Sequence, residues 1–211
     1  MIGLYAIAQG APAGGQGAQG EELRRLRCGA LELVTGAAPP PLSEAALRAH
    51  EAAVRAIAGA CGSCLPARFG AAAADEESLL SLLGAREPEL AEALALVRGR
   101  EQMTLRVHGP AGAVAAGNEG GPGTRYLAER RRARAVPELD PLRAALAAWI
   151  RAERVERHGG ETGLLASAYH LVDRGSAAAY QDAVEATPLA GLRASVTGPW
   201  PAWAFAPELW L

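Results

Sequence analysis

Apolar positions in the first half of the chain follow two repeat lengths, one typical of strands and one of helices. Residues 2–8 form a continuous apolar run that ends at a glycine cluster, which predicts a buried strand. Residues 103–107 alternate apolar and polar side chains, which predicts a half-buried strand. Helical spacing follows two candidate N-caps, Ser43 and Asp75. The other predicted elements are strands at 31–35 and 65–70 and helices at 43–60 and 75–98.

The second half of the chain is predicted to mix helices and strands in the same way. It follows residues 109–123, which are rich in glycine and proline and are expected to form a linker or an open loop. Asp140 is the expected cap of one helix, with Pro141 in its first helical position. The predicted elements are helices at 124–135, 140–158 and 176–186 and strands at 164–172 and 192–197.

These elements predict an α+β fold of two joined small domains, each a ferredoxin-like or modified ferredoxin-like sheet with its helices packed on one face. The expected boundaries are 1–108 for the N-terminal domain, 109–123 for the glycine-rich linker, and 124–211 for the C-terminal domain with its tail. Residues 9–20 contain only Gly, Ala, Gln and Pro and are expected to form a flexible loop.

The end of the chain concentrates aromatic side chains, with Trp200, Trp203, Phe205 and Trp210 within residues 200–211. Pro199 and Pro201 fix the backbone and remove two donors, which excludes a helix or a central strand there. We expect Trp200, Trp203 and Phe205 to pack onto a domain, with a partner-binding ridge as the alternative.

Composition limits the possible partners of the chain. Its 21 basic residues are all arginine, and the net charge of −2 gives no overall field that would attract nucleic acid or an anionic membrane. Its apolar runs are shorter than the ~20 residues of a membrane-spanning helix, and its start lacks the pattern of a secretory signal. We therefore expect a cytoplasmic protein.

Several short motifs suggest chemistry, but each lacks the context that the chemistry needs. Gly15, Gly17 and Gly20 have the spacing of a dinucleotide-binding loop, yet acidic residues follow them where a phosphate would lie. Cys61 and Cys64 have the spacing of a zinc half-site or a redox pair, but Cys28 is the only other thiol. We expect no metal, no cofactor and buried, unreactive thiols.

The remaining polar clusters do not form an active site in the sequence. The basic run at residues 130–134 is flanked by Glu129 and Glu138, which favours a solvated helix face. Glu153, Glu156, His158, Glu161 and His170 have no nucleophile-and-base spacing, and His170 is interpreted as a strand residue with satisfied hydrogen bonds. We expect no catalytic residues.

Two segments are specific enough to indicate a family. Leu65-Pro66-Ala67-Arg68-Phe69-Gly70 and Thr197-Gly198-Pro199-Trp200-Pro201 resemble segments of the GvpF/GvpL family of gas vesicle proteins. Weaker similarities follow in the family's order over nearly the whole chain, at residues 41–43, 75–77, 126–127 and 168–172. The resemblance implies an accessory protein of gas vesicle formation, not an enzyme, located in the cytoplasm or at the vesicle. It also implies that the protein binds the small hydrophobic shell protein GvpA and other accessory Gvp proteins.

Two other classes stay open at this point. A ferredoxin-like fold can also serve a small-molecule-binding or regulatory protein, or an enzyme whose site the sequence does not reveal. In the first of the two segments we expect structural roles for Arg68 and Phe69, with Arg68 paired to a carboxylate from residues 75–77.

Overall fold

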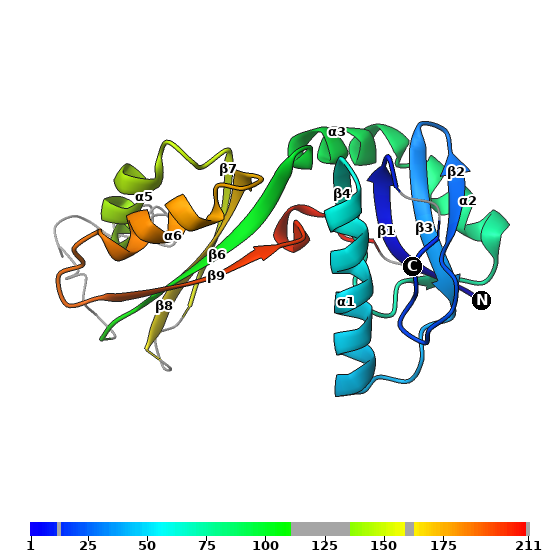
Figure 1. Ribbon diagram of the computed structural model, residues 1–211, viewed down its shortest axis with the longest axis horizontal. Helices are drawn as coiled ribbons and strands as arrows, with labels where there is room; N and C mark the ends of the chain where they lie inside the picture. Colours follow the sequence, from blue (N-terminus) through cyan, green and yellow to red (C-terminus); the bar gives the residue numbers. More distant parts are fainter. Residues whose placement is uncertain (12–13, 111–135, 159–162, 210–211) are drawn as a thin grey trace, which may run out of the picture. The chain divides into compact units, whose positions relative to one another are not determined.

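The computed structural model describes residues 1–11, 14–110, 136–158 and 163–209, and it has a mixed α+β fold (Figure 1). The chain divides into two compact units. The first unit contains Met1–Glu101 together with the end of the chain from Trp200 onward, and the second contains Gln102–Pro199. The chain therefore leaves the first unit, forms the second, and returns to complete the first.

The first unit is built on an antiparallel sheet with the strand order β2-β3-β1-β4, in which β5 also pairs with β1. Ile7 of the central strand β1 lies opposite Leu33 on one side and Leu65 on the other. Residues Leu4 to Ala8 of β1 are all at most 4% exposed. The strands are β1 (Ile2–Gln9), β2 (Arg24–Cys28), β3 (Leu31–Ala37), β4 (Ser63–Pro66) and β5 (Ala72–Ala73).

Helices cover both faces of this sheet, whereas the sequence predicted helices on one face. Val54 and Ile57 of α1 (Glu44–Ala60) pack on the face that carries Ala6 and Ala8. Successive strand residues point to opposite faces, so Ile7 points the other way, toward the side where α3 contacts the sheet. The continuous apolar run of β1 is the sequence signal for a strand that is buried on both faces.

The predicted helix at residues 75–98 is in fact two helices, α2 (Glu76–Gly84) and α3 (Glu87–Val97). Pro88 lies in the first turn of α3. In one continuous helix its ring would clash with the carbonyl of Gly84, four residues earlier, and one hydrogen bond would be lost. The predicted N-caps are confirmed, since the Ser43 and Asp75 side chains accept hydrogen bonds from the backbone N–H groups of Ala46 and Ser78.

The loop that follows β1 is held in place by one carboxylate, although its composition predicted a flexible loop with nothing to pack. The Tyr5 hydroxyl donates to Glu21 Oε1 at 2.8 Å and accepts from the Ala18 N–H at 2.7 Å. Glu21 also accepts from the backbone N–H groups of Gln19 at 2.9 Å and Ala37 at 3.3 Å. Burial raises the pKa of Tyr5 to about 12, so its hydroxyl stays a donor at neutral pH.

The second unit is built on a sheet with the order β7-β8-β6-β9. Apolar residues of β6 and β8, such as Leu105 and Ala168, form one core cluster with Leu142 of α5 and Tyr180 of α6, so both helices pack on the same face. The elements are β6 (Arg100–His108), a short 3-10 helix η1 (Pro137–Leu139), α5 (Asp140–Leu146), β7 (Ala152–Arg157), β8 (Leu164–Asp173), α6 (Ala177–Glu185) and β9 (Arg193–Trp200).

Two features of the second unit differ from the sequence prediction. The predicted helix at 140–158 ends at Leu146 after the 7 residues of α5, and β7 follows as a strand paired with β8, with Val155 opposite Ala168. The strand at 103–107 was expected to close the first domain near residue 108, but as part of β6 it lies between β8 and β9 in the second sheet. The predicted helix at 124–135 and nearly all of the linker at 109–123 lie outside the described residues.

Replacing Glu21 tests the role of this carboxylate in fixing the loop. Glu21→Ala removes the acceptor of three hydrogen bonds and leaves the Tyr5 hydroxyl without its acceptor, so we expect a loss of about 1–3 kcal/mol in the free energy of unfolding. Urea unfolding is the measurement. The control is Glu22→Ala at the exposed neighbouring position, which should change stability by at most about 0.5 kcal/mol. Equal effects of the two changes would contradict this account of the loop.

Candidate functional site

The aromatic tail packs onto the first unit. Phe205, in the 3-10 helix η2 (Trp203–Phe205), is 3% exposed, and Ala202 is also 3% exposed. Trp203 is half-buried and packs against the cluster that joins α1 to the sheet, and η2 contacts β4. Phe205 is therefore packed onto a domain, as the sequence led us to expect. Trp200 and Trp203 are partly exposed.

Arginines hold the tail at both ends. The Arg55 guanidinium of α1 lies over the Trp200 ring, 4.6 Å from its centroid. Arg86 donates from Nη1 to the backbone carbonyl of Glu208 at 2.8 Å, and Glu89 fixes the same guanidinium with two bonds of 2.9 Å. No signal in the sequence pairs Arg86 with Glu208, because 122 residues separate them.

Arg68 and Phe69 have different environments, and the predicted partner of Arg68 is wrong. The Arg68 side chain is 79% exposed, and its Nη2 lies 4.0 Å from Oε1 of Glu208 in the tail. Asp75, the expected partner, instead caps α2. An exposed pair at this distance contributes little to stability, at most about 1 kcal/mol. The structural role proposed for Arg68 therefore has no support from its contacts.

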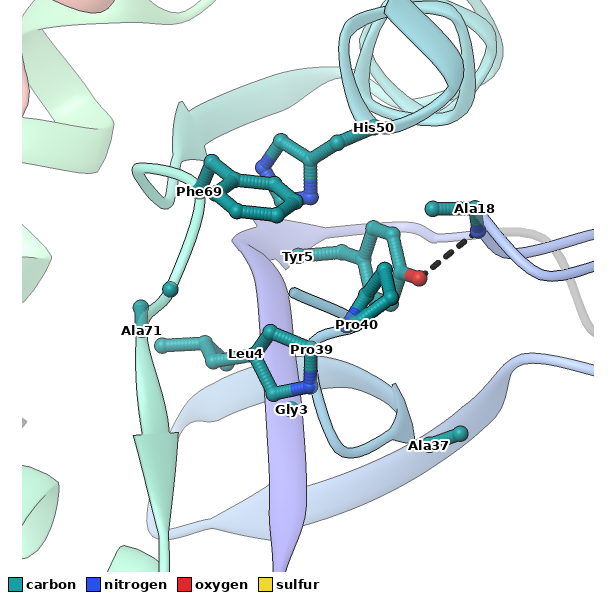
Figure 2. Close-up of a pocket in the computed structure, with 11 residues that line it drawn as sticks. Gly3, Leu4, Tyr5, Ala18, Ala37, Pro39, Pro40, His50, Phe69 and Ala71 are labelled. Atoms are coloured by element: carbon teal, nitrogen blue, oxygen red, sulfur yellow. Dashed lines mark hydrogen bonds between the residues drawn. The ribbon is translucent and has the colours of Figure 1, made fainter. Parts of the chain in front are cut away.

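Phe69 belongs to a ring cluster in the first unit (Figure 2). Its ring meets His50 edge to face, with centroids 5.6 Å apart, and His50 stacks on Tyr5 at 5.0 Å. His50 Nε2 lies 2.9 Å from the carbonyl oxygen of Ala67, in the segment that carries Arg68 and Phe69. The cavity beside these rings has a volume of about 10 Å³, room for about one water molecule. It is too small for a metabolite.

The second unit contains a chain of hydrogen bonds around His170, in which His170 and Tyr180 are buried and Glu153 and Arg143 are partly exposed. His170 Nδ1 lies 2.6 Å from the Tyr180 hydroxyl, and its Nε2 lies 3.1 Å from Glu153 Oε1. Arg143 binds both oxygens of the Glu153 carboxylate. The order of these groups resembles a catalytic arrangement. Tyr180 and His170 are 0% and 1% exposed, however, so a substrate cannot reach them. The interpretation of His170 as a satisfied strand residue is confirmed.

These contacts tie four elements of the second unit together, since Arg143 comes from α5, Glu153 from β7, His170 from β8 and Tyr180 from α6. Burial lowers the pKa of His170, and the Glu153 carboxylate only partly offsets this effect. Burial also opposes ionisation of Glu153, but the hydrogen bonds from Arg143 and His170 outweigh it and lower the pKa of this carboxyl. The neutral imidazole therefore accepts a hydrogen bond from the Tyr180 hydroxyl at Nδ1 and donates one from Nε2 to Glu153.

The motifs that suggested cofactors have structural roles instead. In the glycine-rich loop, the N–H groups of Ala18 and Gln19 already donate to Tyr5 and Glu21, so a carboxylate stands where the dinucleotide pattern would require a phosphate. Cys28, Cys61 and Cys64 are buried thiols. The described residues contain no group of three or more side chains that could hold a metal ion. The basic run at 130–134 lies outside the part of the chain that the structure describes.

Within the same described ranges, none of the helices combines the length and the apolar character that crossing a membrane requires.

Known proteins match the chain over nearly its full length. The family model described as gas vesicle synthesis protein GvpL/GvpF matches residues 2–207. Gas vesicle protein L of Streptomyces sp. (strain CB03234) is 29% identical, over 92% of this chain and 87% of that protein. The match confirms the resemblance that the Arg-Phe-Gly and Pro-Trp-Pro segments indicated.

Two crystal structures share the fold. Gas vesicle protein GvpF from Microcystis aeruginosa has a TM-score of 0.75 at 17% identity, covering 98% of this chain and 99% of that one. GvpF from Anabaena sp. PCC7120 has a TM-score of 0.74 at 15% identity, covering 99% and 96%. These structures show that the α+β architecture of this chain is that of a GvpF protein.

The two buried histidines predict a loss of stability in mild acid. Burial lowers the pKa of His50 and of His170 below the ordinary value of 6.5. As the pH falls through 6.5, these two histidines therefore take up protons in the unfolded chain but not in the folded one. Stability should therefore decrease below pH 6.5, by up to about 1.4 kcal/mol per pH unit for each histidine. Denaturant unfolding at pH 7.5, 6 and 5 measures this slope. His170→Gln, which keeps a donor and an acceptor but does not titrate, should reduce the slope, and an unchanged slope would refute the assignment to His170.

Proposed function

The chain belongs to the gas vesicle synthesis protein GvpL/GvpF family, and we propose that it is an accessory protein of gas vesicle formation that binds the small hydrophobic shell protein. Other accessory Gvp proteins are further proposed partners, and the proposed location is the cytoplasm or the vesicle. The observation that carries the proposal is the family match over residues 2–207.

A binding role fits the chemistry of the described residues better than catalysis. A shell subunit with a strongly apolar surface needs an adaptor that covers this surface before assembly, because exposed apolar patches aggregate. Such an adaptor needs no nucleophile, base or cofactor. Tyr5, His50 and Tyr180, whose pKa values are shifted, are buried in hydrogen bonds or ring contacts within their units. We therefore propose that the protein is not an enzyme.

Strand addition is the proposed mode of binding, and the edge strands differ in how well they would accept a partner. Edge strands commonly carry charged side chains that discourage pairing with another chain. The edge strand β2 exposes Arg24, Arg25 and Arg27, and β7 carries two Glu-Arg pairs, at 153–154 and 156–157.

The edge strand β9 carries fewer charged side chains than β2 or β7. Between Arg193 and Pro199 it contains only Ala, Ser, Val, Thr and Gly. An apolar strand of a partner can pair with such an edge through backbone hydrogen bonds. We propose that the β9 edge binds the shell protein.

Co-expression with a GvpA-type shell protein tests this surface. Ser195→Arg places a charge on the exposed face of β9 without changing buried residues, and it should lower the shell protein recovered in a pull-down by at least about 5-fold, which corresponds to about 1 kcal/mol. The matched control is Ala52→Arg on the exposed side of α1, which should bind like the wild type. Equal recovery with both variants would exclude the β9 edge, and absence of any recovery with the wild-type protein would contradict the proposed function itself.

A further inference from the structure

The tail contacts the first unit in the manner of a bound peptide. The chain enters it from the second unit at Pro199, and from Trp200 onward it belongs to the first. Its contacts there include ones that a separate peptide could make: the buried ring of Phe205, the half-buried ring of Trp203, and the Trp200 ring under Arg55. Trp200 is the point at which the tail joins the rest of the chain.

The tail also has local structure of its own. The backbone N–H of Trp203 donates to the carbonyl of Pro201 at 2.7 Å, and those of Phe205 and Ala206 donate to Ala202 at 3.0 and 3.1 Å. Pro199, Pro201 and Pro207 further restrict the backbone. A segment that is folded by local bonds loses little conformational entropy when it binds, which favours binding as a unit.

The surface under the tail consists of β4, the last turns of α1 with Arg55, and Arg86 at the start of α3, and we call it the tail-binding surface. β4 ends the strand order of the first sheet and contacts η2. Arg86 is held in position by Glu89, a neighbour on its own helix, so the guanidinium that binds the Glu208 carbonyl is fixed independently of the tail. This surface therefore does not require that the tail come from the same chain.

We propose that the tail-binding surface also takes the tail of a second copy of this chain, so that two copies exchange tails and form a dimer. The tail-binding surface already holds the chain's own tail, and the identical tail of a second copy can make the same contacts. Exchange of an identical element replaces each lost contact with an equal one, so its main cost is the association of two chains. The intramolecular arrangement is favoured at low protein concentration, since a linked segment has an effective concentration of the order of millimolar.

Tail exchange goes beyond the proposed function and does not rest on it. The shell protein is proposed to pair with the β9 edge, whereas a second copy would occupy β4 and its neighbours in the first unit. A failed pull-down of shell protein and a failed tail exchange are therefore separate results.

Refolding two differently tagged full-length copies together tests tail exchange without any substitution in the protein. The copies are unfolded, mixed, refolded at about 1 mM, which matches the effective concentration of a linked tail, and purified through one tag. The second tag should co-purify, and a dimer should appear in light scattering.

A synthetic peptide of residues 200–209 provides the specificity control. In excess during refolding it should reduce co-purification at least about 5-fold, whereas the same peptide with Phe205→Ala should leave it unchanged, because truncating a buried phenylalanine costs about 3–5 kcal/mol. Absence of co-purification without peptide would overturn the proposal. Co-purification that the unmodified peptide does not reduce, or that both peptides reduce equally, would also overturn it.

Discussion

Burial of the Phe205 ring ties the last part of the chain to the first unit, whose other residues come from the beginning of the sequence. The first unit contains residues 1–101, but its sheet edge at β4 and its α1-side cluster are completed by residues from the last part of the sequence. Aromatic side chains bury the largest areas available to a tail, which explains why this end holds a tryptophan and a phenylalanine around η2. The second unit is consequently an insertion between Glu101 and Trp200 of the first.

The units are stabilised by buried polar groups in different ways. In the first unit, Glu21 and Tyr5 fix a glycine-rich loop whose side chains cannot pack by themselves. In the second, Arg143, Glu153, His170 and Tyr180 connect two helices to two strands. Both sets are satisfied within their own unit, and the cavity beside the Tyr5 ring holds no more than about one water. The chemistry of the described residues thus supports stability, and function in the family is proposed to come from the outer edges of the sheets.

Local patterns predicted most strands and helices, because periodicity and caps report on local structure. The strand at residues 2–8, the caps at Ser43 and Asp75, and the strand at 164–172 are examples that the structure confirms. The errors have long-range causes. The helical spacing after Asp140 continues into β7 because only pairing with β8 makes that segment a strand. The division into units escaped prediction because β6 pairs with β8 and Arg86 binds Glu208, contacts that no local pattern contains. The Arg-Phe-Gly and Pro-Trp-Pro segments indicated the family, but they did not show that Arg68 is exposed.

Hydrogen exchange of the Phe205→Ala variant, resolved by segment, measures most directly whether the tail completes the first unit. The account predicts that amide protection falls in β4 and α1, which face the tail, and stays unchanged in β8, whose core cluster contains no tail residue among the described ones. Protection that is retained in β4 and α1, or lost equally in β8, would contradict the claim that Phe205 ties the end of the chain to the core of its beginning.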